Sequence, residues 1–176
     1  MKKIITAVLL SAFVAAPAVA ADAGGVYAGI KMGPSDVAGS TLGFGVYGGY
    51  DVGPIITSNN FMSKVSFAGE AEYTDFGSNS SGAFTYKASA IGFVVAATYP
   101  INPQFSAIAK AGLARTAYDV TCAGCSAAWN YTTNTIGLRA GAAGQYNLTR
   151  QIGLRAGLDF YPDGYSMILA GAVIKF

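Results

Sequence analysis

Seven charged residues could act together if the chain is extended. They stand among glycines and other small residues at alternate positions, a spacing that places them on one face of the strands that contain them. The set holds four bases and three acids: Lys31, Glu70, Glu72, Lys110, Arg139, Arg155 and Asp159. Charges of both signs in one interior could line an ion path or a gate. They could also neutralise one another in a packed ion-pair core, because one unpaired buried charge costs several kcal/mol.

The two cysteines lie close together, in the sequence Cys122-Ala123-Gly124-Cys125. A C-x-x-C pair can be redox-active, supply half of a zinc site, or close a small disulfide. The chain has no histidine and no second thiol pair, so tetrahedral zinc would lack ligands. No βαβ pattern surrounds the motif, as a thioredoxin-like role would require. The missing histidine also excludes Ser-His-Asp and Cys-His catalysis, so we predict no catalytic residue, no metal and no other cofactor.

The first twenty residues have the pattern of a secretory signal peptide. Lys2 and Lys3 precede an apolar run, and Ala18-Val19-Ala20 is a small-x-small cleavage site. We therefore expect residues 1–20 to be removed and residues 21–176 to form the mature domain. Loss of the two lysines leaves nine basic against nine acidic residues, so the pI near 8.5 does not indicate nucleic-acid binding. Export to an oxidising compartment favours a disulfide between the two cysteines.

The remaining sequence alternates between apolar and polar residues. Charged residues make up 11% of the chain and hydrophobic residues 52%, a composition that suits contact with lipid. No apolar run of helix-spanning length follows Ala20, so membrane helices are not predicted. Within 151–160, the even-numbered positions hold Ile, Leu, Ala, Leu and Phe, and the odd-numbered positions hold Gln, Gly, Arg, Gly and Asp. This alternation, or parity, is the period of a strand. Such segments, separated by turn residues, predict eight strands: 25–32, 41–51, 63–76, 84–99, 104–118, 131–146, 151–161 and 165–176.

These strands predict an all-β fold, an eight-stranded antiparallel up-and-down transmembrane β-barrel. Most reach the roughly 9–11 residues that a tilted strand needs to cross a bilayer, and an open sheet edge in lipid would leave backbone groups unpaired. The charged parity is also rich in glycine, whereas a soluble lipocalin-like barrel would hold large apolar side chains inside and charges outside. Aromatic residues near strand ends are expected to form girdles at the two membrane surfaces: Tyr50, Tyr73, Phe76, Tyr99, Phe105, Tyr118, Tyr146, Phe160, Tyr161, Tyr165 and Phe176.

A barrel this narrow favours the packed ion-pair core over an ion path. Eight strands enclose an interior only wide enough for their own side chains. Arg139 is expected nearly opposite Asp159, across a short turn between neighbouring strands. Glu70 is expected to face Gly43 and Ala90, whose small size would leave room for Lys31 or Lys110 to reach its carboxylate.

The end of the chain has a regular apolar pattern. Ile168, Ala170, Ala172 and Ile174 alternate with other residues and are followed by Phe176. In this ending and in its eight alternating segments the chain resembles the small outer-membrane barrels of Gram-negative bacteria, of the OmpA/OmpX and opacity-protein type. The resemblance covers essentially the whole mature chain. It implies location in the bacterial outer membrane, contact with its lipid and lipopolysaccharide, and a C-terminal signal read by the outer-membrane assembly machinery. The peptidoglycan-binding domain of longer family members is expected to be absent.

Two positive residues fall on the lipid-facing parity. Lys87 and Arg115 lie far along their strands from the turn at 100–103. The resemblance implies that both chain ends are in the periplasm, and on that basis we expect the two residues near the outer leaflet. Counting from that turn places them almost side by side. Like charges so placed repel unless an anion bridges them, so contact with lipopolysaccharide phosphates is one interpretation. The other is two side chains that extend to the membrane edge, where a cation costs only about 0–1 kcal/mol.

Small barrels serve as adhesins, enzymes and structural proteins, so the resemblance implies a fold more firmly than a function. We predict a non-enzymatic outer-membrane protein with a structural or surface-interaction role, whose outer loops, especially 118–130, contact a protein partner. These loops are short and nearly uncharged, which favours membrane packing or an accessory role over an adhesin with large loops. A narrow pore, or transport of small hydrophobic compounds, is the alternative. Enzymes of this barrel class use a catalytic histidine, as the resemblance implies, and the chain has none.

Overall fold

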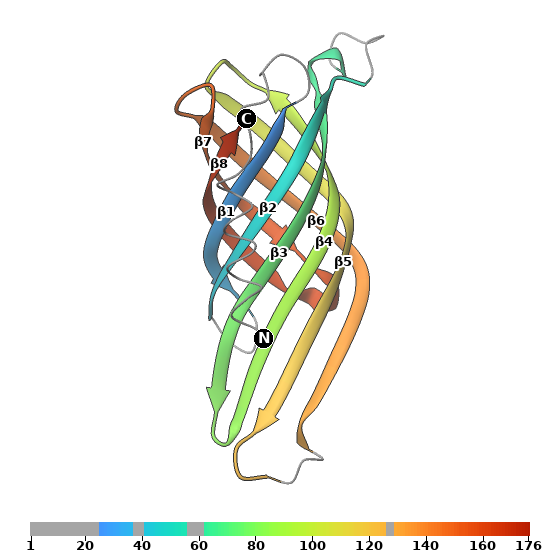
Figure 1. Ribbon diagram of the computed structural model, residues 1–176, viewed down its shortest axis with the longest axis vertical. Helices are drawn as coiled ribbons and strands as arrows, with labels where there is room; N and C mark the ends of the chain where they lie inside the picture. The colour runs from blue at the N-terminus through green and yellow to red at the C-terminus, as the bar shows by residue number, and fades with distance from the viewer. Residues whose placement is uncertain (1–24, 37–40, 56–61, 126–128) are drawn as a thin grey trace.

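The computed structural model describes residues 25–36, 41–55, 62–125 and 129–176. Within these ranges, eight antiparallel strands close into a barrel in sequence order, with the first strand paired to the last (Figure 1). The predicted eight-stranded up-and-down barrel is therefore confirmed. The predicted signal peptide lies outside the described residues. The strands are β1 (Val26–Ser35), β2 (Thr41–Gly53), β3 (Ser66–Ser81), β4 (Phe84–Pro100), β5 (Phe105–Cys122), β6 (Tyr131–Asn147), β7 (Ile152–Phe160) and β8 (Ser166–Lys175), with short 3-10 turns η1 (Met62–Lys64) and η3 (Pro162–Gly164).

Side-chain burial follows the parity of the sequence. On β5, Lys110 and Ala114 are buried in the interior, whereas Leu113 between them is 56% exposed on the outer wall. The outer wall also carries Phe93 and Leu138, which are 69% and 81% exposed. An apolar surface of this extent is stable against lipid but not against water. No helix in the part of the chain that the structure describes is long and apolar enough to span a membrane.

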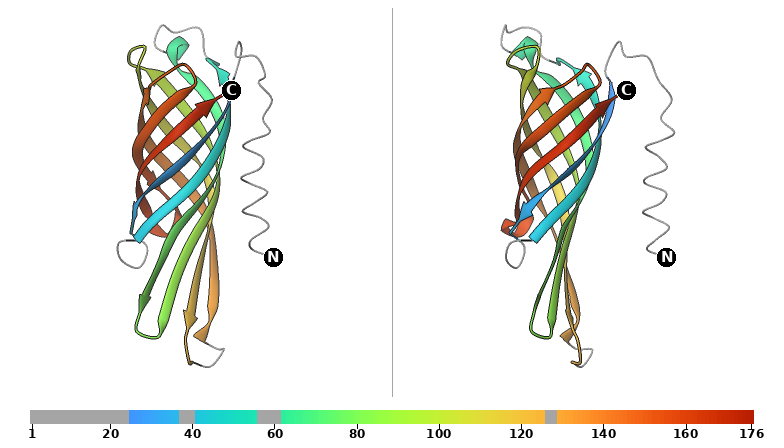
Figure 2. Two further views of the ribbon diagram at one scale, coloured as in Figure 1. Left: turned by 60° about the vertical axis from the view of Figure 1, so that its left-hand side comes forward. Right: turned by 90° about the vertical axis from the view of Figure 1, so that its left-hand side faces the viewer.

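The two ends of the barrel differ. The start of β1 and the end of β8 lie at one end, called here the inner end, and the β3–β4 and β5–β6 connections lie at the other, the outer end (Figure 1). Strands β3 to β6 have 16 to 18 residues, whereas β1, β2, β7 and β8 have 9 to 13. The four longer strands therefore project beyond the closed barrel, as Figure 2 shows from two further directions. We call this projection the outer sheet; it comprises residues 75–81, 84–89, 116–122 and 131–135.

The outer sheet corrects the sequence prediction, which placed residues 77–81 and 119–122 in a turn and a loop. The predicted turn at 77–82 is mostly strand, since β3 continues to Ser81. The predicted loop at 118–130 begins later, because β5 continues to Cys122. Pairing with β4 extends both strands, and a bulge between Asp75 and Ser78 lets β3 bend without ending. Gly77 allows this bend because its backbone has a φ of 86°.

The predicted aromatic girdles are partly wrong. Tyr50, Phe105 and Phe160 are about half exposed on the outer wall, as expected of residues that contact the membrane surface. Phe76 and Tyr161 are instead buried in a core cluster at the outer end of the lumen. Two further aromatics assigned to the girdles, Tyr118 and Tyr165, pack against that cluster. Position near a strand end therefore did not decide the direction of these rings; strand parity did.

Candidate functional sites in the lumen and the outer sheet

The seven predicted lumen residues are all buried, and they separate into two ion clusters. The outer ion cluster consists of Lys31, Glu72, Arg139 and Asp159. The Nζ atom of Lys31 lies 3.0 Å from Glu72 Oε2 and 2.8 Å from Asp159 Oδ2. Arg139 pairs with Glu72 and places Nη2 2.7 Å from Asp159 Oδ2. Tyr161 accepts a hydrogen bond from Lys31 Nζ at 2.7 Å, and its hydroxyl lies 3.1 Å from Glu72 Oε1. Two bases and two acids make this cluster neutral.

The inner ion cluster consists of Glu70, Lys110 and Arg155. Lys110 Nζ lies 2.5 Å from Glu70 Oε2, and Arg155 Nη1 lies 2.8 Å from Glu70 Oε1. The hydroxyl of Tyr27 donates to Glu70 Oε1 at 2.8 Å. Gln145 Oε1 accepts from Arg155 Nε at 3.2 Å and from Nη2 at 3.1 Å, so the guanidinium is held on both sides.

One carboxylate faces two cations in the inner ion cluster, which leaves one positive charge in excess. An aromatic face compensates part of this excess. Lys110 Nζ lies 4.9 Å and Arg155 Cζ 4.8 Å from the centroid of the Tyr47 ring. Cations near the face of an aromatic ring are attracted by its quadrupole, more strongly when water is excluded.

Small residues opposite the charged ones provide the space that both clusters need. A Cβ atom on Gly45 would lie 2.9 Å from Lys31 Cε, and one on Gly141 would overlap Asp159 Oδ1. The observed register differs from the predicted one, because Glu70 pairs with Gly49 and Val94 rather than with Gly43 and Ala90. The ion pairs cross the lumen, from β3 to β7 and from β3 to β6. Side chains therefore occupy the width of the barrel at this level.

The two outward-facing cations are not neighbours. Lys87 pairs with Asp119 on β5, whereas Arg115 lies between Ile91 and Ile136 on the adjoining strands. The predicted side-by-side position is wrong because the turn between β4 and β5 is longer than assumed: Pro100 pairs with Ser106. Arg115 thus lies at the outer limit of the apolar wall, and Lys87 lies beyond that limit in the outer sheet.

Two other predicted sites lie at opposite ends of the molecule. Cys122 and Cys125 are joined in a disulfide at the tip of the outer sheet, and the Cys122 amide donates to Asn130 Oδ1 at 2.8 Å. At the inner end, the Phe176 amide donates to the carbonyl of Val26 at 2.9 Å, which fixes the last residue beside β1. The alternating residues assigned to the assembly signal follow the outward parity of β8: Ile168, Ala170, Ala172 and Ile174.

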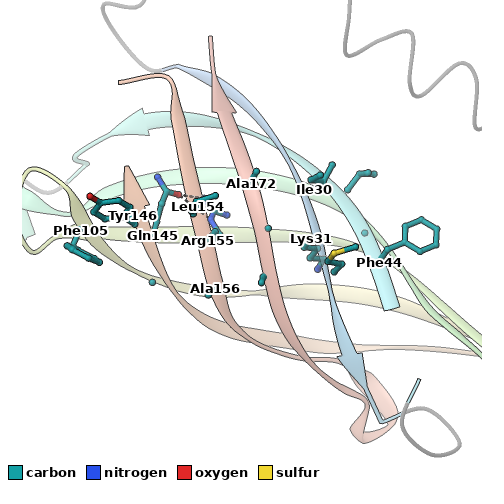
Figure 3. A pocket seen from close by; sticks show the side chains of 16 residues that line it. Ile30, Lys31, Phe44, Phe105, Gln145, Tyr146, Leu154, Arg155, Ala156 and Ala172 are labelled. Carbon is teal, nitrogen blue, oxygen red and sulfur yellow. Dashed lines mark hydrogen bonds between the residues drawn. The ribbon is translucent and has the colours of Figure 1, made fainter. Parts of the chain in front are cut away.

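The outer wall contains a recess of about 890 Å³ that faces the lipid (Figure 3). Its floor includes the small residues Ala156 and Ala172, and Ile30, Phe44 and Leu154 rise beside them. Lys31 and Arg155 approach the recess from the lumen side of the same strands (Figure 3). The shape and apolar lining suit hydrocarbon chains of the bilayer.

An aromatic column lies on the inner face of the outer sheet, the face continuous with the lumen wall. It consists of Phe84 and Tyr86 on β4, Tyr118 on β5 and Tyr165 before β8. Neighbouring rings have centroids 6.2 to 6.4 Å apart and planes inclined by only 22° to 23°. Trp129 approaches Phe84 at the tip, with centroids 6.4 Å apart. Sequence reasoning missed this column; the even parity that Tyr118 shares with the inward residues of β5 was the signal.

The sequence profile of the outer membrane protein beta-barrel domain family matches residues 5–166. The chain belongs to this family. It is an outer-membrane protein, and the predicted resemblance and location are both confirmed. No curated protein matches its sequence.

Solved structures show the same fold as this outer-membrane barrel at low sequence identity. Ail, the attachment invasion locus protein of Yersinia pestis, has a TM-score of 0.60 and 16% identity over 87% of this chain and 97% of Ail. Neisserial surface protein A has a TM-score of 0.58 and 18% identity over 90% of this chain and 100% of that one. The N-terminal barrel domain of Pseudomonas aeruginosa OprF has a TM-score of 0.60 and 14% identity over 87% of this chain and 99% of that domain.

Proposed function

We propose that this outer-membrane barrel is a non-enzymatic surface protein whose outer sheet contacts other molecules outside the cell. The observation that carries the proposal is the unequal length of the strands. Four strands continue beyond the closed barrel as a paired sheet, although a shorter connection would suffice to cross the membrane. A rigid projection is better suited than a flexible loop to present a fixed contact surface, because little conformational entropy is lost on binding.

The edges of the outer sheet support the same proposal. Residues 131–135 of β6 pair with β5, but among the described residues they have no strand partner on their other side. The corresponding edge of β3 is interrupted by its bulge and by a hydrogen bond from the Gly77 amide to Asp75 Oδ1. A bulge blunts an edge, whereas an unmodified edge can pair with another extended chain. The β6 edge is therefore the better candidate for contact with a protein partner.

The alternative of a narrow pore is less well supported. Ion pairs that span the lumen would have to separate before an ion could pass. Separation is costly, because each broken pair would leave unpaired charges in the barrel interior. We expect recordings in planar bilayers to give no stable conductance. Stable channels of defined size would favour the pore.

Contacts with the membrane complete the proposal. Arg115, which has apolar residues on both sides, would bind a lipopolysaccharide phosphate, whereas the Asp119 carboxylate opposite Lys87 would weaken binding there. The outward residues of β8 together with Phe176 would form the signal for the assembly machinery.

The test of surface contact is to shorten the outer sheet while keeping the barrel. In the trimmed variant, Asn-Gly turns replace residues 77–87 and 117–134. We expect it to insert and fold, since the ion clusters remain, but bacteria that display it should lose the adherence to host-cell monolayers that the full chain confers. Adherence unchanged by trimming, or a full chain that confers none above cells lacking it, would overturn the proposal.

A further inference from the structure

The inner face of the outer sheet has a chemical character unlike that of the lumen below it. The lumen contains charged inward residues that are paired with one another, whereas the inward residues of the outer sheet are uncharged and are aromatic, apolar, or bear a hydroxyl or an amide. The charged residues Lys87 and Asp119 lie on the opposite face of the sheet, as their parity and pairing require. Within the described part of the chain, the nearest carboxylate on the inner side is that of Asp163, which accepts a hydrogen bond from Thr116 Oγ1 at 3.0 Å.

The rings of the aromatic column remain partly exposed. Centroids more than 6 Å apart with nearly parallel planes describe rings that lie side by side or strongly offset, not rings that cover one another. Phe84, Tyr86, Tyr118 and Tyr165 are each half-buried, whereas Ala88 and Val120 beneath them are buried. The sheet therefore supports a row of flat apolar surfaces and fixes their orientation.

Polar side chains flank this row on both sides. Asn79 pairs with Tyr86 and Ser81 with Phe84, so an amide and a hydroxyl lie on the β3 side of the column. On the β6 side, Thr133 pairs with Tyr118 and presents another hydroxyl on the same face. Flat apolar surfaces with a few adjacent neutral hydrogen-bonding groups are the arrangement that binding sites use to hold and orient a ligand.

The chemistry of this face selects among ligands. A nucleic acid or a sulfated polymer would need lysine or arginine for its anionic groups, and neither residue lies on this face of the described outer sheet. A lipid chain would gain nothing from the flanking hydroxyls. A sugar ring has an apolar face of C–H groups, which stacks on an aromatic ring, and hydroxyls at its rim, which hydrogen-bond to neutral side chains.

We propose that the aromatic column of the outer sheet binds a neutral oligosaccharide, with sugar rings stacked on Tyr86 and Tyr118 and sugar hydroxyls bonded to the polar residues beside them. The proposal rests on the proposed function, since it names the ligand class for the same outer sheet. Stacking requires the ring and not its hydroxyl, so phenylalanine should replace either tyrosine without loss.

The test uses the full chain folded in lipid nanodiscs and saturation-transfer NMR with three neutral probes: maltohexaose, cellohexaose and chitohexaose. We expect at least one probe to bind, with affinity about tenfold lower in Tyr86→Ala or Tyr118→Ala. Tyr86→Phe should bind as the wild type does. Tyr50→Ala, which removes a ring from the outer wall near the inner end, is the matched control and should also bind normally. Heat-modified migration in SDS gels checks that each variant is folded.

Two outcomes would overturn the proposal. One is that none of the three probes binds at millimolar concentration; the other is that Tyr86→Ala and Tyr118→Ala, although folded, bind as tightly as Tyr50→Ala. The adherence assay separates this result from the proposed function. If adherence is lost on trimming but no probe binds, the outer sheet contacts a ligand of another class, such as a protein, and only the oligosaccharide site is wrong.

Discussion

The membrane-spanning barrel and the outer sheet share four strands, but the two faces of those strands differ in polarity between the two regions. In the barrel the charged residues face inward and the outward face is apolar, whereas in the outer sheet the charged residues face outward. On β5, the barrel places Lys110 inside and Leu113 outside, whereas the outer sheet places Tyr118 inside and Asp119 outside. On β4 and β5, strand parity continues unbroken through the change. What changes is the medium: lipid surrounds the barrel wall, and water surrounds the outer sheet. The polarity of a face therefore reports its surroundings and not its position on the strand.

The comparison also separates two ways of stabilising an inner face. In the barrel, the charged side chains are buried and must be paired with opposite charges, so each depends on its partners. In the outer sheet, the inward residues are held by contacts between rings and by backbone pairing. Removal of one of these side chains leaves no unpaired charge. We therefore expect the effects of substitutions to be large in the barrel and small in the outer sheet.

The largest expected effect is that of Arg139→Ala. This change removes the guanidinium that pairs with Glu72 and Asp159, so two buried carboxylates would share the single charge of Lys31. We expect a loss of about 3–5 kcal/mol in the free energy of unfolding, measured by urea titration in lipid vesicles. Arg115→Ala, on the outer wall, is the matched control and should cost about 1 kcal/mol or less. Equal losses for the two arginines would mean that the lumen charges are not a coupled core.

A smaller effect is expected when a charge is added to the outward face. Val95 is 56% exposed on the outer wall, well inside the apolar part of β4. Val95→Lys should cost about 2–4 kcal/mol in the same titration, because the ammonium group would enter hydrocarbon. Thr121→Lys makes the same change on the outward face of the outer sheet and should alter stability by no more than about 0.5 kcal/mol. If both lysines prove equally tolerated, the boundary between lipid and water does not lie where the faces change.

The smallest expected effect on stability concerns the two outward cations at that boundary. Arg115→Ala should reduce the lipopolysaccharide that co-purifies with the barrel, whereas Lys87→Ala should reduce it less, because Asp119 opposes Lys87. Quantitative mass spectrometry of lipid A in preparations purified in mild detergent measures the difference, and neither change should cost more than about 1 kcal/mol. Lipopolysaccharide retention unaffected by Arg115→Ala would exclude the proposed phosphate contact.

The sequence was sufficient for the fold class and for the membership of the lumen set, because both depend on a period of two residues. It was insufficient for register, which depends on where each turn begins and ends. Glu70 was expected opposite Ala90 instead of Val94 because β3 continues through the polar segment 77–81, and a shift at one turn moves every pair on the hairpin. A separate misplacement, of the turn between β4 and β5, put Lys87 beside Arg115. The aromatic column was hidden because Tyr118 and Tyr165 were judged by their distance from strand ends instead of by parity, and Phe84 and Tyr86 were assigned no role.

The pairing of β1 with β8 makes the first and last strands neighbours, although they are the two strands farthest apart in sequence. Contacts of such long range are slow to form, because the entropy cost of closing a large loop comes before any stabilising hydrogen bond between the strands. Until that final seam forms, both strands present open backbone edges that lipid cannot hydrogen-bond. Barrel closure therefore depends on kinetics as well as on stability. The unpaired edges of β1 and β8 must not pair with other chains before they pair with each other.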